Sequence, residues 1–172
     1  MHYHWTGRHV ANLMLKRINN SELNSKQQEM YHFQKIYGVL AQYGFNCIKL
    51  ADDWRGADFL AYSTDQDETL RVQLKGRLSV SKKYIGKSRH MAFPLNQGWC
   101  VVPHVLLVEV VGENTNWLES KSWTEKGEYH TSKSSSSLVE LFGLFTVHVT
   151  LPAASVGQLA SGCHSTFRPI GT

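Results

Sequence analysis

The strongest constraint on the fold is a helical segment that is followed directly by strand-like segments. Apolar side chains recur at helical spacing up to Gly44, where the pattern stops, and Ser25 stands three residues before Gln28 as in a capping box. These features predict a helix over residues 26–43. This helix is the first strong element of the chain.

Three strand-like segments follow the predicted helix. Residues 45–50, 57–62 and 70–77 alternate apolar and polar side chains, which is the period of a strand with one buried face. The polar stretch 63–69 lies between the last two segments and is rich in turn-forming residues, so we expect a hairpin there. Together these segments predict an α/β domain with a mixed central β-sheet flanked by helices.

Two further elements are predicted in the second half of the chain. Residues 101–111 are rich in β-branched side chains and almost continuously apolar, as expected of a strand that is buried on both faces. Pro103 should mark its beginning, because proline cannot donate in the middle of a ladder. Ser137 and Glu140 match a second capping box, which predicts the start of a helix.

Length and composition allow one domain with a proper core. The chain has 172 residues, of which 42% are hydrophobic and only 19% charged, which is typical of a globular protein. We expect a single domain over 23–150 and a loosely structured tail over 151–172. The N-terminal segment 1–22 receives no firm assignment beyond a short helix around 10–18.

Several function classes are excluded by what the sequence lacks. No window approaches 18 apolar residues and the N-terminus lacks the order of a secretory signal, so we expect a soluble, cytoplasmic protein with no membrane partner. Cys47, Cys100 and Cys163 form no CxxC pair and are expected to be ordinary thiols. The phosphate-binding, dinucleotide-binding and hydrolase motifs GxxxxGK[ST], GxGxxG and GxSxG are absent.

Charge is distributed unevenly along the chain. Residues 52–68 hold six acidic side chains and one basic one, whereas residues 71–89 hold seven of the 18 basic residues and no acid. The two blocks are either solvated faces of a hairpin or a metal-binding cluster beside a surface for a polyanion. The formal net charge of +4 does not decide between these interpretations.

The third predicted strand combines a core face with a polar face. Period-two geometry places Gln73 and Lys75 on one face and Leu74 on the other. If the hairpin forms, Asp58 lies at about the level of Gln73 and Lys75. Asp58, the Gln73 side-chain oxygen and the Leu74 backbone carbonyl could then hold Mg²⁺, while Lys75 orients or deprotonates a water for phosphodiester hydrolysis.

These residues resemble a known family. Asp58, followed after 14 residues by Gln73-Leu74-Lys75, resembles the PD-(D/E)XK nuclease superfamily in its D…QxK form, as found in Mrr-type restriction endonucleases. The resemblance covers residues 25–111. It implies a restriction-endonuclease-like fold and a Mg²⁺-dependent endonuclease, with Mn²⁺ able to substitute, that hydrolyses DNA in repair, recombination or defence. It also implies that the protein could act as a homodimer.

The resemblance adds one helix residue to the candidate site. It assigns Glu29 to the outer shell of the metal site; the alternative is a plain exposed acid on the helix. The sequence also departs from the family's common pattern at two positions. Gly56-Ala57 stands where the family often has a proline before its aspartate. The proline is not a ligand, so this departure does not change the donor set. Gln73 replaces the commoner glutamate, which removes one negative charge and should weaken Mg²⁺ binding without abolishing it.

The basic block after the third strand is a candidate surface for nucleic acid. Its cations could contact phosphates, and its one tyrosine could stack on an unpaired base. The alternative is a solvated loop without a ligand. The candidate residues are Arg77, Lys82, Lys83, Tyr84, Lys87 and Arg89.

Other interpretations remain open at this stage. A catalytically silent nucleic-acid-binding module of the same fold, or an interaction protein without a nucleic-acid role, would keep the same core pattern. Asp52 and Asp53 are metal candidates, although adjacent residues on a strand point to opposite faces and such pairs often close turns. Trp54 could line a substrate groove, and His104 is interpreted as a core residue.

Overall fold

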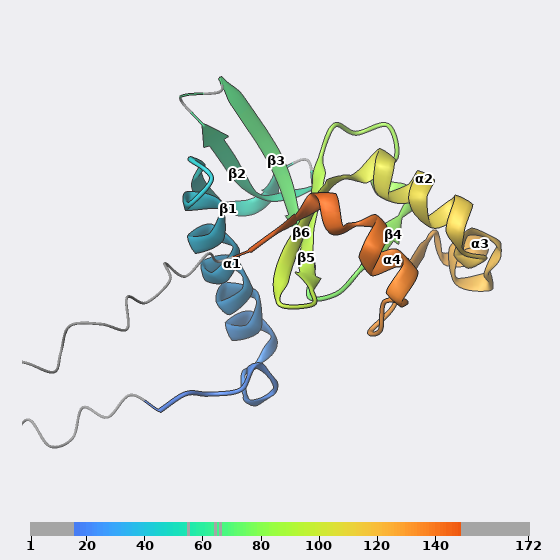
Figure 1. The fold of residues 1–172 in the computed structure, drawn as a ribbon, viewed down its shortest axis with the longest axis horizontal. Coiled ribbons are helices and arrows are strands. Elements are labelled where there is room, and N and C mark those ends of the chain that lie inside the picture. Colours follow the sequence, from blue (N-terminus) through green and yellow to red (C-terminus); the bar gives the residue numbers. More distant parts are fainter. Residues whose placement is uncertain (1–15, 55, 64, 66, 149–172) are drawn as a thin grey trace, which may run out of the picture.

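The computed structural model describes residues 16–54, 56–63, 65 and 67–148 (Figure 1). Most of the expected helix around 10–18 and the whole tail 151–172 lie outside these residues. Within the described part of the chain, no helix is long and apolar enough to cross a membrane.

The described residues form a mixed α/β structure. In chain order its elements are η1 (Asn20–Glu22), α1 (Ser25–Ala41), β1 (Asn46–Trp54), β2 (Ala57–Ser63), β3 (Glu68–Leu74), β4 (Ser79–Ser81), η2 (Lys82–Tyr84), β5 (His90–Leu95), β6 (Gly98–Pro103), α2 (His104–Asn114), η3 (Trp117–Glu119), α3 (Lys121–Lys126), β7 (Glu128–His130), α4 (Ser136–Leu141), η4 (Gly143–Phe145) and β8 (Thr146–Val147).

The central sheet has six strands in the order β1-β2-β3-β5-β6-β8. Among the described strands, β3 and β5 pair in parallel and the other neighbours in this sheet pair antiparallel. A separate two-stranded sheet of β4 and β7 lies in the connections around it. The predicted mixed sheet flanked by helices is therefore confirmed.

Each face of the central sheet is covered by different helices (Figure 1). On one face, Ile36 and Leu40 of α1 pack against Phe59 and Val72 of β2 and β3. On the other face, the core includes Leu107 and others from α2, α3 and α4. Val72 faces α1, and side chains alternate along a strand. The next residue, Gln73, therefore points away from α1.

The first half of the chain folds largely as its pattern predicts. Helix α1 begins one residue earlier than expected, because Asn24 and Gln27, rather than Ser25 and Gln28, form the capping box. The predicted hairpin is confirmed by the β2–β3 register, in which Ser63 pairs with Glu68. A helix also follows the serine run, although Ser135 caps it through the Leu138 N–H.

The predicted strand over residues 101–111 is wrong. Pro103 ends β6 instead of opening a strand, and the apolar run continues as helix α2. Leu107 and Val111 are fully buried at helical spacing, whereas Val105 is 64% exposed. A short apolar run satisfies either period in sequence, so packing against the sheet decides the outcome.

The two described cysteines behave as structural thiols, with Cys100 buried and Cys47 partly buried. Cys47 and Cys100 are both free. Burial raises the pKa of the Cys47 thiol to about 11 and that of the Cys100 thiol to about 12. Both remain protonated near neutral pH, which leaves neither as a nucleophile or metal ligand. Cys163 lies outside the described residues.

Candidate active site

The structure brings Asp58 and Gln73 together at the end of the β2–β3 ladder. Phe59 pairs with Val72 in the antiparallel register, so Asp58 stands opposite Gln73. The Asp58 carboxylate oxygen Oδ2 accepts hydrogen bonds from the Leu74 backbone N–H at 2.7 Å and from the Gln73 amide Nε2 at 2.5 Å. One backbone donor and one side-chain donor thus fix the position of this carboxylate.

The second polar atom of the Gln73 amide has no such partner. The Gln73 side chain is 6% exposed, and its Oε1 is buried without a hydrogen bond among the described residues. The oxygen and nitrogen of an amide are assigned from their partners. With the amide turned over, Oε1 would face the Asp58 carboxylate, and a cation between the two oxygens would satisfy both.

This donor set fits a hard divalent cation. Asp58, the Gln73 amide oxygen and the Leu74 backbone carbonyl supply the oxygen atoms that Mg²⁺ prefers. Within the described residues, no group of three or more His, Cys, Asp or Glu side chains is gathered in a way that could hold a metal ion. The candidate site therefore rests on one carboxylate and neutral oxygens, which predicts weak binding of the cation in the absence of substrate.

Glu29 lies at the surface of α1. Its side chain is 54% exposed, as in the exposed alternative that the sequence left open, and it forms an ion pair with Lys49 of β1 at 2.5 Å. Glu29 and Asp58 nevertheless line the same surface groove of about 520 Å³, together with Lys49. The groove brings the two acids to one concave surface, and Lys49 balances the charge of Glu29.

Lys49 is a site residue that sequence reasoning missed. It lies in the strand-like segment 45–50, whose alternation places it on the α1 face beside Cys47. Its ammonium lies 5.6 Å from the centroid of the Phe33 ring, next to the ion pair with Glu29. The sequence did contain a signal for this residue. Lys49 is a lysine at an inward position of a strand, and the helix before that strand carries an acid.

The predicted strand over residues 70–77 ends at Leu74, so Lys75 follows β3 and lines a neighbouring cavity. Its backbone N–H donates to the Ala92 carbonyl at 2.8 Å, which fixes the end of β3 against β5. Its ammonium lies 5.7 Å from the centroid of the Tyr84 ring. It lines a cavity of about 490 Å³ that also includes Arg77 and Lys83. Lys75 thus lies close to the Asp58–Gln73 pair in the chain and also lines a cavity with basic residues.

The basic block is only partly an exposed surface. Arg77, Lys82, Lys83 and Lys87 are exposed, as expected of residues that contact phosphates. Tyr84, however, is only 2% exposed. The η2 turn directs its ring into the core formed with Val80 and Leu107. The expectation that Tyr84 stacks on an unpaired base is therefore wrong for this structure.

Arg89 also departs from the expected strip. It is 6% exposed, and its guanidinium carbon lies 5.0 Å from the centroid of the Tyr84 ring. On its other side it contacts the backbone at Gly56, where a Cβ would come within 1.9 Å of the Arg89 Nη1. Arg89 is therefore a buried residue between the β2 start and Tyr84, not a member of a solvent-exposed strip.

His104 is buried beside these residues, as the sequence predicts for a core histidine. It is 1% exposed, its ring packs edge-on to Tyr84, and its Nε2 accepts a hydrogen bond from the Ser81 N–H at 3.4 Å. Burial, and secondarily the Arg89 charge, lowers the pKa of His104 to about 4. The imidazole is therefore neutral at physiological pH.

Some candidates lie outside the described side chains. The side chains of Asp52, Asp53 and Trp54 are among them, so their interpretations as metal ligands or groove residues stay predictions.

Comparisons with protein-family models and with curated proteins found no match for this chain. Among solved structures, the chain is similar to Hjc, a Holliday junction resolvase from Archaeoglobus fulgidus, with 16% identity and a TM-score of 0.36 over 45% of this chain and 73% of that one. It is also similar to the bacterial homing endonuclease I-Ssp6803I, with 13% identity and a TM-score of 0.38 over 66% of this chain and 78% of that one. At these scores the likeness assigns neither a family nor a function to this chain.

Proposed function

We propose that this chain is a Mg²⁺-dependent endonuclease of restriction-endonuclease-like fold that hydrolyses phosphodiester bonds of DNA, with Mn²⁺ as a substitute cation. The observation that carries the proposal is the Asp58 carboxylate, held by the Leu74 N–H and the Gln73 amide at the end of β3, with Lys75 as the next residue of the chain. The resemblance adds a role in repair, recombination or defence and a homodimer to this proposal. The proposal also keeps the cytoplasmic location that the sequence predicts.

The residues of β2 and β3 divide the proposed chemistry between them. Asp58, Gln73 and the Leu74 carbonyl would hold the cation, and the hydrogen bond from the Leu74 N–H keeps the Asp58 carboxylate in one orientation. When bound, Mg²⁺ supplies a Lewis acid for a phosphoryl oxygen and a water of lowered pKa. Lys75 would orient the attacking water and stabilise the negative charge that develops on the phosphate.

Glu29 contributes to the proposed site through its ion pair. In the present arrangement Lys49 balances its carboxylate. Exposed ion pairs are worth only about 0 to 1 kcal/mol, so Glu29 can exchange Lys49 for a water in the outer shell of the cation at little cost.

The exposed cations provide the contact with the DNA backbone. Arg77, Lys82, Lys83 and Lys87 surround the end of β3 and the η2 turn. Four phosphate contacts would give a slope of about −3.6 for the logarithm of the binding constant against the logarithm of salt concentration on duplex DNA. Binding should therefore weaken strongly between low and moderate salt.

A catalytically silent nucleic-acid-binding module is the second candidate function. Gln73 donates to Asp58 and Lys49 pairs with Glu29, so both acids of the groove already have partners within the protein. This candidate predicts the same salt-sensitive DNA binding but no cleavage and no measurable Mg²⁺ site.

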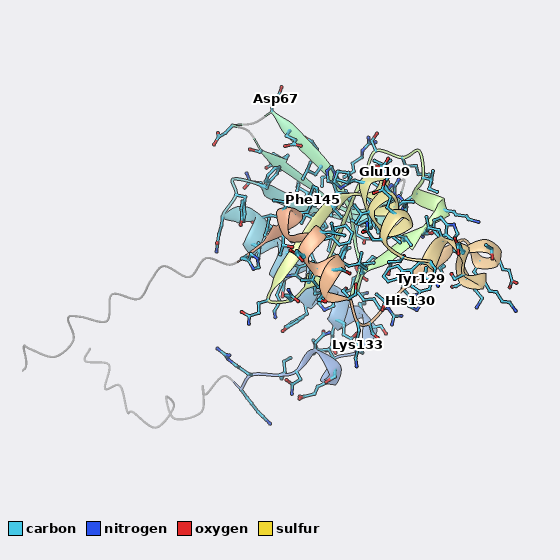
Figure 2. The ribbon with its side chains drawn as sticks, turned by 45° about the vertical axis from the view of Figure 1, so that its right-hand side comes forward. Asp67, Glu109, Tyr129, His130, Lys133 and Phe145 are labelled. Atoms are coloured by element: carbon cyan, nitrogen blue, oxygen red, sulfur yellow. The ribbon has the colours of Figure 1, made fainter. Side chains whose placement is uncertain are left out.

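Nicking of supercoiled DNA in Mg²⁺ or Mn²⁺ tests the proposed function. Asp58→Asn and Lys75→Met remove one charge each, and we expect cleavage to fall at least a hundredfold in both. The matched controls are Glu109→Gln on α2, labelled in Figure 2, and Lys121→Met on α3, both of which remove an exposed charge.

The outcomes separate the candidates. Equal cleavage by the parent, Asp58→Asn and Lys75→Met would overturn the assigned site. Salt-sensitive binding by the parent without cleavage in either metal would favour the silent module. Calorimetric titration of the parent with Mg²⁺ and with DNA distinguishes this module from an interaction protein that binds neither.

A further inference from the structure

The cavity beside Lys75, called the basic pocket below, is built from separate parts of the chain. It has a volume of about 490 Å³ and lies where the end of β3, the η2 turn and β7 meet. Figure 2 shows Tyr129 and His130 next to each other on β7, which lines one wall. Its charged and hydrogen-bonding lining residues include Lys75, Arg77, Lys83, Tyr84, Glu128 and His130.

Positive charge is concentrated around one buried ring in this pocket. The ammonium of Lys83 lies 4.8 Å and that of Lys75 5.7 Å from the centroid of the Tyr84 ring, and the Arg89 guanidinium carbon lies 5.0 Å from it. Like charges this close raise the local potential, because the partly buried surroundings screen them less than water does. Glu128 is the acid of the lining, and it is exposed at the rim.

A buried histidine lies beside Tyr84 and is also reached by the Arg89 charge. The pKa of His104 is lowered first by burial and then by the charge of Arg89. Its ring packs edge-on to the ring of Tyr84, so it lies against the pocket wall. The Arg89 charge therefore acts on both Tyr84 and His104.

The Tyr84 hydroxyl supplies an unfilled hydrogen bond. It is buried, and it has no hydrogen-bond partner among the described residues. Buried hydroxyls nearly always have a partner, which can be a ligand. An anion that enters the pocket could accept this hydrogen bond while the ammonium groups of Lys75 and Lys83 balance its charge.

We propose that the basic pocket binds a phosphate group, held by Lys75, Arg77, Lys83 and the Tyr84 hydroxyl. The inference rests on the proposed function, because it names which part of the substrate this pocket takes: a phosphate close to the bond that is cleaved. Lys75 directly follows the last residue of β3 and comes two residues after Gln73, or about 6.8 Å at the usual strand rise. That distance corresponds to about two nucleotides of axial rise along one DNA strand.

Titration of the metal-free protein with inorganic phosphate, followed by amide chemical shifts, tests the pocket without requiring catalysis. Tyr84→Phe keeps the ring in the core and removes the hydroxyl, and we expect it to weaken phosphate binding about tenfold. Lys83→Gln should weaken binding by a similar factor. Lys121→Gln, an exposed lysine of α3, should leave the affinity unchanged.

Thermal unfolding gives a second measurement of the same interaction. Phosphate should raise the melting temperature of the parent and of Lys121→Gln more than that of Tyr84→Phe. Tyr84→Phe without phosphate should be at least as stable as the parent, because it removes a hydroxyl that has no partner. Unchanged phosphate binding in both Tyr84→Phe and Lys83→Gln, or no phosphate binding by the parent, would overturn the proposal.

Short duplexes with and without a 5′-phosphate identify the source of the phosphate. A preference for the phosphorylated duplex that Tyr84→Phe removes would assign the pocket to a terminal monoester. Equal binding of both duplexes, weakened equally by Tyr84→Phe, would assign it to a backbone phosphodiester. A parent that binds phosphate in this way but cuts no DNA would contradict the proposed function and leave the pocket standing.

Discussion

Replacing Gln73 by glutamate places a second carboxylate beside Asp58 at the end of β3. In the native chain the Gln73 amide donates to the Asp58 Oδ2 at 2.5 Å, and the side chain is 6% exposed. Gln73→Glu keeps the shape of the side chain but replaces this donor with a carboxylate. Two carboxylates would then face each other in a nearly buried place, where either a cation or a shared proton must separate them.

The size of the effect follows from this geometry. Two unit charges about 4 Å apart repel by about 4 kcal/mol at an effective dielectric constant of about 20. The alternative is to protonate one carboxyl at pH 7, which costs about 3.7 kcal/mol from the usual glutamate pKa of about 4.3. Both routes predict that metal-free Gln73→Glu is less stable than the parent by about 3 to 4 kcal/mol.

Thermal unfolding with and without Mg²⁺ measures the loss of stability and its reversal by the cation. For a chain of this size a loss of 3 to 4 kcal/mol lowers the melting temperature by about 6 to 16 °C. Mg²⁺ should restore the variant more than it stabilises the parent, because two carboxylates bind the cation more tightly than one. The deficit should also shrink as the pH falls toward 4, because the shared proton is then supplied at no cost.

Gln34→Glu on α1 is the matched control, because Gln34 is exposed and lines none of the cavities described above. It should change stability by less than about 0.5 kcal/mol. The reasoning fails if metal-free Gln73→Glu unfolds at the temperature of the parent, or if Mg²⁺ shifts both proteins equally. Either result would mean that Gln73 and Asp58 are not close enough to form a cation site.

Two further predictions concern the residues that support this region. Because the pKa of His104 is lowered to about 4, the neutral form stabilises the fold above pH 6.5, and stability falls as the pH drops toward 4. Urea unfolding at pH 6.5 and 5 should show a loss of about 1.6 kcal/mol in the parent that His104→Gln lacks; a parallel loss in both proteins would assign it to other groups. Gly56→Ala should lower the melting temperature by about 3 to 8 °C, because its φ is +81° and a Cβ would collide with Arg89. Gly38→Ala, in α1 with nothing within 4 Å of its Cβ, should instead raise the melting temperature, and equal effects of the two changes would refute the role given to Arg89.

The meeting of Asp58 and Gln73 could be predicted because it depends only on local geometry. A polar stretch between two alternating segments fixes a hairpin, and antiparallel register then places the two residues opposite each other. The same short-range rules predicted α1, which begins one residue and ends two residues earlier than expected. No contact between distant elements was needed for either prediction.

The positions of Glu29, Tyr84 and Arg89 could not be predicted, because they depend on packing between distant segments. For Glu29 the sequence left an exposed position open, but its ion pair with Lys49 depends on β1 packing beside α1. Tyr84 and Arg89 stand among lysines in the sequence, but η2 and β5 direct them inward. A run of like charges indicates where a polyanion could bind, but it does not tell which members of the run are exposed.

In the folded chain, members of the acidic block lie at opposite ends of the β2–β3 hairpin. Asp67 lies at the tip of the β2–β3 hairpin (Figure 2), and Glu68 pairs with Ser63 at that same far end. From the acidic block, Asp58 therefore reaches the end of β3 near Lys75, where the basic pocket begins. A single carboxylate beside several cations attracts free Mg²⁺ weakly, whereas Mg²⁺ commonly takes substrate phosphate oxygens as additional ligands. Under the proposed function, the cation and the nucleic acid would each strengthen the binding of the other, because the phosphate supplies the negative charge that Gln73 lacks.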